Sequence, residues 1–210
     1  MLAVMPRRET AKGREENEVE FSRIVAFSDG VFAIAITLLV LELHVPDHLH
    51  NSKEVWEALW DERETFLAFA ISFAVIGRFW IVHHRFFGEV KAFDGALLWL
   101  NLLYLGTIVL IPFSSQVLGE YGGDGAGVAV YAINLAATIL VGLWMMDRAH
   151  RIGLTNADAA TRREGMVRAA YIAAVFLASI PVAFVAPGFA QLMWLVLFFD
   201  PADYLARRRT

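Results

Sequence analysis

The apolar residues of this 210-residue chain lie in blocks long enough to cross a lipid bilayer. A spanning helix needs about 20 consecutive, mostly apolar residues, because the hydrocarbon core of a bilayer is about 30 Å thick. The chain is 58% hydrophobic and 19% charged, which leaves too few polar residues to cover a soluble domain. The sequence therefore predicts an all-α integral membrane protein with little mass outside the bilayer.

Four of the blocks each match one spanning helix, and the last block is too long for one. The four cover residues 24–43, 66–87, 96–118 and 128–146. Residues 169–199 carry no charge, and the turn signal Pro187-Gly188 divides them into a fifth and a sixth span. If this last block formed one long helix instead, the chain would have five spans.

The distribution of charge favours six spans over five. Lys and Arg collect in the N-terminal tail, near Arg85, between Arg148 and Arg168, and at residues 207–209, whereas residues 46–64 are mostly acidic. Under the positive-inside rule both termini are then cytoplasmic, which requires an even number of spans. The predicted parts are a cytoplasmic tail at residues 1–21, a six-helix membrane domain at residues 22–206 and a basic tail at residues 207–210.

The residue types that the chain lacks exclude several chemistries. It has no cysteine, so disulfides and thiolate metal sites are excluded. It also contains neither the G-x-S-x-G nor the H-E-x-x-H pattern of hydrolytic sites. We expect no enzymatic activity, no cofactor, no bound metal beyond a permeating ion and no nucleic-acid partner.

Asp29 lies inside the first apolar block, where an ionisable group is costly. If Arg23 marks the membrane interface, the helical rise puts Asp29 about 9 Å deeper and Ile34 about 16 Å deeper, near the midplane. The carboxylate should then face protein or water rather than lipid. Asp29 and Arg23 lie on different faces of the helix, so the partner of Asp29 should come from another helix.

The candidate partners of Asp29 are His83, His84 and Asn101, which lie at a matching depth in the second and third spans. A buried network of Ser28, Asp29, a histidine and Asn101 would join three helices near the cytoplasmic side. Polar side chains commonly hold membrane helices together in this way. A proton relay or an ion site at Asp29 is the alternative.

The first helix also carries an apolar stripe. Ile34, Leu38 and Leu41 are spaced four and three residues apart, so they share one face, and Thr37 lies beside them. On periodicity alone, ordinary helix packing is the usual explanation of such a stripe.

Three segments together resemble the bacterial members of the transmembrane protein 175 family, the lysosomal-type potassium channels. In the first helix, Arg23 is followed after three residues by Phe27-Ser28-Asp29. The second segment is FWIVHH at residues 79–84, and the third combines NLLYL and IPFSS within residues 101–115. The resemblance covers essentially the whole chain.

The resemblance implies a homotetramer of six-helix subunits in the plasma membrane of a bacterium, with the first helices lining a central potassium-permeable pore. It implies no TVGYG filter loop, and none occurs in the sequence. The residues implied as a hydrophobic constriction are Ile34, Leu38 and Leu41, with Thr37 as a polar layer. The residues implied as structural are Arg23, Phe27, Ser28, Asp29, His83, His84 and Asn101.

A proton-coupled or proton-leak carrier that uses Asp29 is the second hypothesis. Such a carrier favours paired broken helices and inverted repeats, and neither is visible in the sequence. An intramembrane enzyme ranks last, because no nucleophile–base pair is evident.

Overall fold

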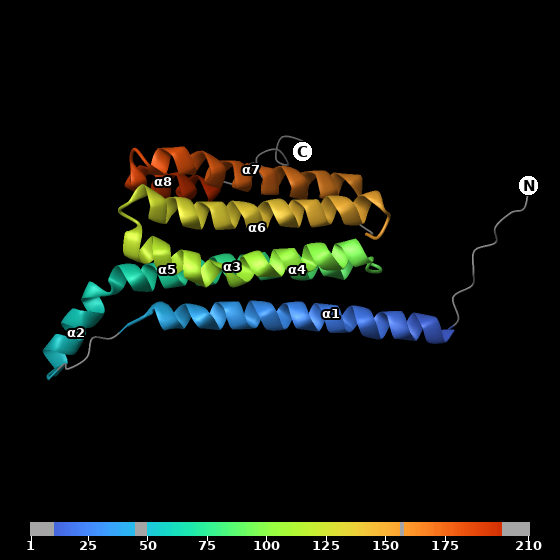
Figure 1. The fold of residues 1–210 in the computed structure, drawn as a ribbon, viewed down its shortest axis with the longest axis horizontal. Helices are drawn as coiled ribbons and strands as arrows, with labels where there is room; N and C mark the ends of the chain where they lie inside the picture. The colour runs from blue at the N-terminus through green and yellow to red at the C-terminus, as the bar shows by residue number, and fades with distance from the viewer. Residues whose placement is uncertain (1–10, 45–49, 156–157, 199–210) are drawn as a thin grey trace, which may run out of the picture.

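The computed structural model describes residues 11–44, 50–155 and 158–198, and the long helices among them pack along a common direction (Figure 1). In chain order they are α1 (Ala11–Leu38), α2 (Ser52–Asp61), α3 (Arg63–Glu89), α4 (Gly95–Val109), α5 (Ile111–Tyr121), α6 (Gly125–Arg151), α7 (Ala159–Ala183) and α8 (Pro187–Met193). Two 3₁₀ turns, η1 (Leu39–Glu42) and η2 (Trp194–Phe198), follow α1 and α8.

Among the described residues, five helical stretches are long and apolar enough to cross a membrane, so the prediction of an all-α membrane protein is confirmed. They are Val19–Glu42, Thr65–Glu89, Gly95–Tyr121, Gly125–Arg151 and Ala160–Ala183. In Figure 1, α1 runs along one edge of the bundle and α7 along the other, with α6 packed between α7 and the group α3 to α5. The core between these helices includes Phe32, Ile76, Ile108 and Leu135.

α1 begins at Ala11, well before the predicted start of the first span at residue 24. Residues 11–21, predicted as part of a polar tail, therefore continue the membrane helix. Lysine, arginine and glutamate dominate this extension, and they are good helix formers. Further along, Phe32, Ala35 and Leu39 are buried at intervals of three and four residues, so one side of α1 packs on α3 and α4.

The third predicted span consists of two helices joined end to end. α4 ends at Val109, and α5 starts at Ile111, directly before Pro112. Proline has no backbone N–H to donate, and its ring clashes with the carbonyl four residues earlier, so the hydrogen-bond ladder is interrupted here. The two helices still form one candidate span.

The described part of the chain contains five candidate spans, whereas six were predicted. The predicted turn is present, because α7 ends and α8 starts at Pro187. The returning segment lies against α7, where Trp194 Nε1 donates to Ser179 Oγ at 3.0 Å. The apolar helix Pro187–Leu197 covers nearly all of the predicted sixth span and is shorter than the five candidate spans, and only residue 199 of that predicted span lies outside the described residues.

α2 is a short helix that the sequence analysis did not predict. Its N-cap residue, Asn51, accepts a hydrogen bond from the Glu54 backbone N–H at 3.0 Å. Glu54 in turn accepts from the backbone N–H of His50 at 2.7 Å. The Asn-x-x-Glu spacing resembles a capping box and was the available signal for a helix start.

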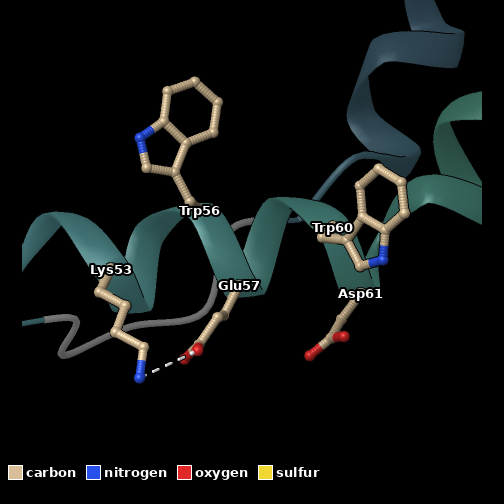
Figure 2. A pocket seen from close by; sticks show the side chains of 5 residues that line it. All are labelled: Lys53, Trp56, Glu57, Trp60 and Asp61. Atoms are coloured by element: carbon tan, nitrogen blue, oxygen red, sulfur yellow. Dashed lines mark ion pairs between the residues drawn. The ribbon is translucent and has the colours of Figure 1, made fainter.

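α2 leaves the bundle at an angle and has two different sides (Figure 1). Figure 2 shows Trp56 and Trp60 on one side of the helix, and Lys53, Glu57 and Asp61 on the other. Lys53 and Glu57 form an ion pair at 3.5 Å. These five residues line an open hollow along a single helix, so it is not an enclosed binding cavity.

Basic and acidic residues lie mainly at opposite ends of the bundle. The basic end, where α3 meets α4 and α6 meets α7, holds Arg85, Arg151 and Arg162. Here Asp147 accepts from both Arg151 and Arg162 at 2.6 Å. The acidic end, where α5 meets α6, holds Glu120 and Asp124, with α2 beyond it.

Asp94 connects two helices at the basic end. Its carboxylate caps α4 by accepting from Leu97 N–H at 2.8 Å, and it pairs with Arg148 of α6. The Arg148 hydrogen bond, followed by the Leu97 bond, lowers the pKa of Asp94 below its ordinary value. A carboxyl whose pKa is lowered by folding stabilises the folded protein at pH values above its ordinary pKa. This stabilisation is lost as the pH falls through the pKa that the carboxyl has in the folded protein.

The Asp94→Asn variant should therefore melt below the wild type near neutral pH, with the difference shrinking as the pH falls below about 4. Asparagine can still cap α4, so the comparison isolates the Arg148 pair. Both partners are about one-third exposed, which limits the effect to less than about 1 kcal/mol. Thermal melts of the purified protein across this pH range provide the measurement, and a pH-independent difference would contradict the expectation.

Candidate functional site

The two sides of α1 have opposite environments. One side is buried against the other helices of the subunit, and its residues are Ser28, Phe32, Ala35 and Leu39. At 100° per residue, Ile34, Leu38 and Leu41 lie on the opposite side, where they are 60%, 38% and 67% exposed. The stripe predicted as a constriction is therefore left uncovered by the described helices of its own subunit.

Arg23, Phe27 and Thr37 lie on the same uncovered side of α1. The prediction grouped Arg23 and Phe27 with the buried polar residues, but the structure does not bring them together. Thr37 Oγ1 donates to the Ile34 carbonyl at 2.8 Å. Its hydroxyl proton is thus held by the backbone, whereas the oxygen keeps lone pairs that can accept from other groups.

A buried polar triad joins α1, α3 and α4 toward the basic end. Asn101 Nδ2 donates to Ser28 Oγ at 3.0 Å, and Asn101 Oδ1 lies 2.8 Å from His83 Nε2. Since the amide oxygen only accepts, His83 Nε2 is the donor. Ser28 Oγ in turn donates to the Ile24 carbonyl at 2.9 Å. The three side chains are at most 2% exposed and bond to one another in a consistent order.

Aromatic rings hold the imidazole of His83 in place. It stacks on Tyr104 with a centroid distance of 5.4 Å and an interplanar angle of 17°. Phe32 and Phe87 contact it at centroid distances of 5.2 and 4.4 Å. This packing fixes the direction in which Nε2 donates, so the triad has one defined geometry.

Asp29 lies outside this triad, contrary to the single network that was predicted. Its Oδ1 accepts from Trp80 Nε1 at 2.8 Å, and His84 stacks on the Trp80 ring at 5.4 Å. Asp29 and the triad are separated because the side chains of consecutive residues in a helix point about 100° apart. Ser28 and Asp29 therefore face different surroundings, as do His83 and His84. The partner of Asp29 does come from another helix, but it is a tryptophan.

A second buried polar cluster, which was not predicted from the sequence, lies at the acidic end. Glu42 is 8% exposed, and its Oε2 accepts from Ser115 Oγ at 3.1 Å. The Ser115 and Ser72 hydroxyls are 2.8 Å apart, and Ser72 lies 3.3 Å from the Tyr131 hydroxyl. This chain of hydrogen bonds connects η1, α5, α3 and α6. The available signal was Glu42 itself, the one ionisable residue in the second half of the first apolar block.

Together these features define a class of protein. It is a helical membrane protein whose first helix is fixed by polar clusters on one side and exposes an apolar stripe on the other. The described residues contain no group of three or more His, Asp or Glu side chains that could hold a metal ion.

Comparison with known proteins shows the family. Residues 23–112 match the family described as the endosomal/lysosomal potassium channel TMEM175. A potassium channel of Streptomyces collinus is 35% identical over 173 residues, which cover 79% of this chain and 84% of that protein. The chain belongs to the TMEM175 family, whose members are channels and not enzymes.

Two further relatives bear on the fold and the function. The crystal structure of a lysosomal potassium-selective channel TMEM175 homolog from Chamaesiphon minutus matches with a TM-score of 0.71. It is 33% identical, and the match covers 90% of this chain and 98% of that chain. The endosomal/lysosomal proton channel TMEM175 of Homo sapiens is 31% identical over 143 residues, which span 61% of this chain but 28% of that protein.

Proposed function

We propose that this protein is the subunit of a potassium-permeable cation channel in which four copies surround a pore lined by α1. The uncovered stripe of Ile34, Leu38 and Leu41 carries the proposal. An apolar helix face left bare by its own subunit fits a surface shared between copies. The S. collinus and C. minutus relatives are both described as potassium channels, which supports the choice of ion.

In this proposal the subunit has six spans, and both termini lie in the cytoplasm of a bacterium. The short apolar helix formed by α8 and η2 is the sixth span in this proposal. The basic end of the bundle then faces the cytoplasm, as the positive-inside rule requires. Residues 1–21 and 207–210 form the cytoplasmic tails, and residues 22–206 form the channel domain in the plasma membrane.

Four Ile34 side chains around one axis would form a narrow ring that water wets poorly, which is an established gating device. Rings at Leu38 and Leu41 would extend the constriction over about 10 Å along the helix. Isoleucine and leucine have no oxygen to replace the water around an ion, so we expect a weak preference for potassium over sodium. The Thr37 oxygens would add a polar layer, since their lone pairs are available.

Planar-bilayer recordings of the purified protein test the proposed function. Under opposing potassium and sodium gradients, we expect discrete single-channel steps and a reversal potential displaced toward that of potassium. Transport without steps, at rates no higher than carrier turnover, would contradict a channel. A mass measurement in detergent tests the four-fold assembly separately.

The second candidate, a proton-coupled or proton-leak carrier, is favoured by the position of Asp29. Its carboxylate is partly exposed and accepts a hydrogen bond from Trp80 on another helix. The human relative is called a proton channel, which adds to this candidate. Under the main proposal, however, Asp29 acts as a tether between α1 and α3.

We expect Asp29→Asn to assemble normally and to retain potassium current, because the amide oxygen still accepts from Trp80 Nε1. Asp29→Ala should lower the yield of assembled protein, because Trp80 then loses its partner. Current and pH change in loaded vesicles are measured together for both variants. Selective loss of proton flux in Asp29→Asn, with potassium flux retained, would instead favour the proton carrier.

A further inference from the structure

The winding of the first helix changes at its acidic end. η1 is a 3₁₀ turn, in which residues three apart lie on the same side. This winding puts Leu39 and Glu42 on the inward side, 0% and 8% exposed, while Val40 and Leu41 remain outward at 53% and 67%. The burial of Glu42 and the outward position of Leu41 are therefore set by one turn of helix.

Neutral groups surround the carboxyl of Glu42. Oε2 accepts from Ser115, whose hydroxyl contacts Ser72, which in turn contacts Tyr131. Oε1 is buried and has no hydrogen-bond partner among the described residues. A buried carboxyl without a countercharge is costly, and an apolar side chain of similar size is often accommodated as well or better. Stability alone therefore does not account for a glutamate here.

The Glu42 cluster is the second of two buried polar attachments along α1 and η1. The first is Ser28 in the triad with Asn101 and His83. The two attachments are 14 residues apart, about 21 Å along the helix. Ile34 lies between them on the opposite side, and Leu41 directly precedes the second. α1 is therefore fixed near both ends of the stretch that carries the exposed stripe.

We propose that Glu42 is the positioning residue for the acidic-end part of the pore. Its carboxyl, held by Ser115, sets the rotation and radial position of η1 and thereby the ring formed by Leu41. This inference rests on the proposed function, because it requires α1 to line the pore. Without the attachment, the 3₁₀ turn is free to shift or rewind, which rotates Leu41 relative to the pore axis.

The test compares Glu42→Val, Glu42→Gln and Ser115→Ala in the same planar-bilayer system as the wild type, with the amount of assembled channel measured by size exclusion. Glu42→Val should change the unitary conductance and shift the reversal potential, and Ser115→Ala should change both in the same direction. Glu42→Gln should behave as the wild type, because its amide oxygen still accepts from Ser115. Glu120→Gln is the control, because it removes an exposed carboxylate at the same end.

Three outcomes would overturn the inference. In one, assembled Glu42→Val and Ser115→Ala channels keep the wild-type conductance and reversal potential. In another, these variants lower only the yield of assembled protein, which is what a purely structural role predicts. In the last, Glu42→Gln changes the conductance and reversal potential as Glu42→Val does, while Ser115→Ala leaves both at the wild-type values. The charge of Glu42, rather than its position, would then matter. A wild type that does not conduct overturns the proposed function itself.

Discussion

Ile34→Asn is expected to raise the potassium current per assembled channel by about tenfold, which corresponds to a barrier lower by about 1.4 kcal/mol. Ile34 lies on the uncovered stripe of α1 and is 60% exposed in the subunit. In the proposed pore, its apolar side chains exclude water from the constriction. Asparagine is polar and can hydrogen-bond water, so it should wet the ring and weaken discrimination against sodium. Bilayer recordings normalised to the amount of tetramer provide the measurement.

Ile133→Asn is a matched control for this change. Ile133 is also an isoleucine, it is 53% exposed, and it lies on α6, which is separated from α1 by α3 to α5 (Figure 1). The control should alter stability and leave the current per channel unchanged. If well-assembled Ile34→Asn also showed wild-type current and selectivity, the constriction would have to lie elsewhere on the stripe, at Leu38 or Leu41.

Asn101→Leu is expected to lower the free energy of unfolding by about 2–4 kcal/mol, because two buried polar groups lose their partner at once. Ser28 Oγ loses a donor and His83 Nε2 loses an acceptor, and both side chains are at most 2% exposed. A single hydrogen bond between membrane helices contributes only about 0.6 kcal/mol on average. The main cost therefore comes from leaving both buried groups without a hydrogen-bond partner. Thermal melts and the fraction of assembled protein report the loss.

Thr107→Val on the same helix is the control for Asn101→Leu. The Thr107 hydroxyl donates to the Tyr104 carbonyl of its own helix at 2.6 Å, so its removal leaves the contacts between helices intact. Adding Ser28→Ala to Asn101→Leu should cost less than the two changes separately, because they belong to one network. Additive effects, or an Asn101→Leu melt equal to that of Thr107→Val, would show that the triad does not hold the helices together.

The class of protein and most of its spans were predictable from the sequence, because hydrophobic length is a local property. Four apolar blocks of about 20 residues, and the first part of the longer block at residues 169–199, overlap the five candidate spans among the described residues. The break before Pro112 divided the third span without ending it. The extension of α1 back to Ala11 was missed, since its polar residues carry no membrane signal.

The candidate site, too, was predictable from the sequence only in part. Sequence spacing placed Ile34, Leu38 and Leu41 on one face of a helix, because that face follows from 3.6 residues per turn. The same spacing does not say which face meets the other helices of the subunit. The tertiary structure decides this by burying Phe32 and Leu39, which leaves the stripe exposed.

Partners of polar side chains were decided by the tertiary structure alone. The sequence showed that Ser28, Asp29, His83 and Asn101 lie at similar depths, but depth does not specify direction. Rotation of α3 about its axis turns His83 toward Asn101 and places Trp80 against Asp29. Likewise, the 3₁₀ winding of η1 turns Glu42 inward to Ser115, which is 73 residues away in the chain. Such rotations result from packing of the whole bundle, so no local stretch of sequence contains them.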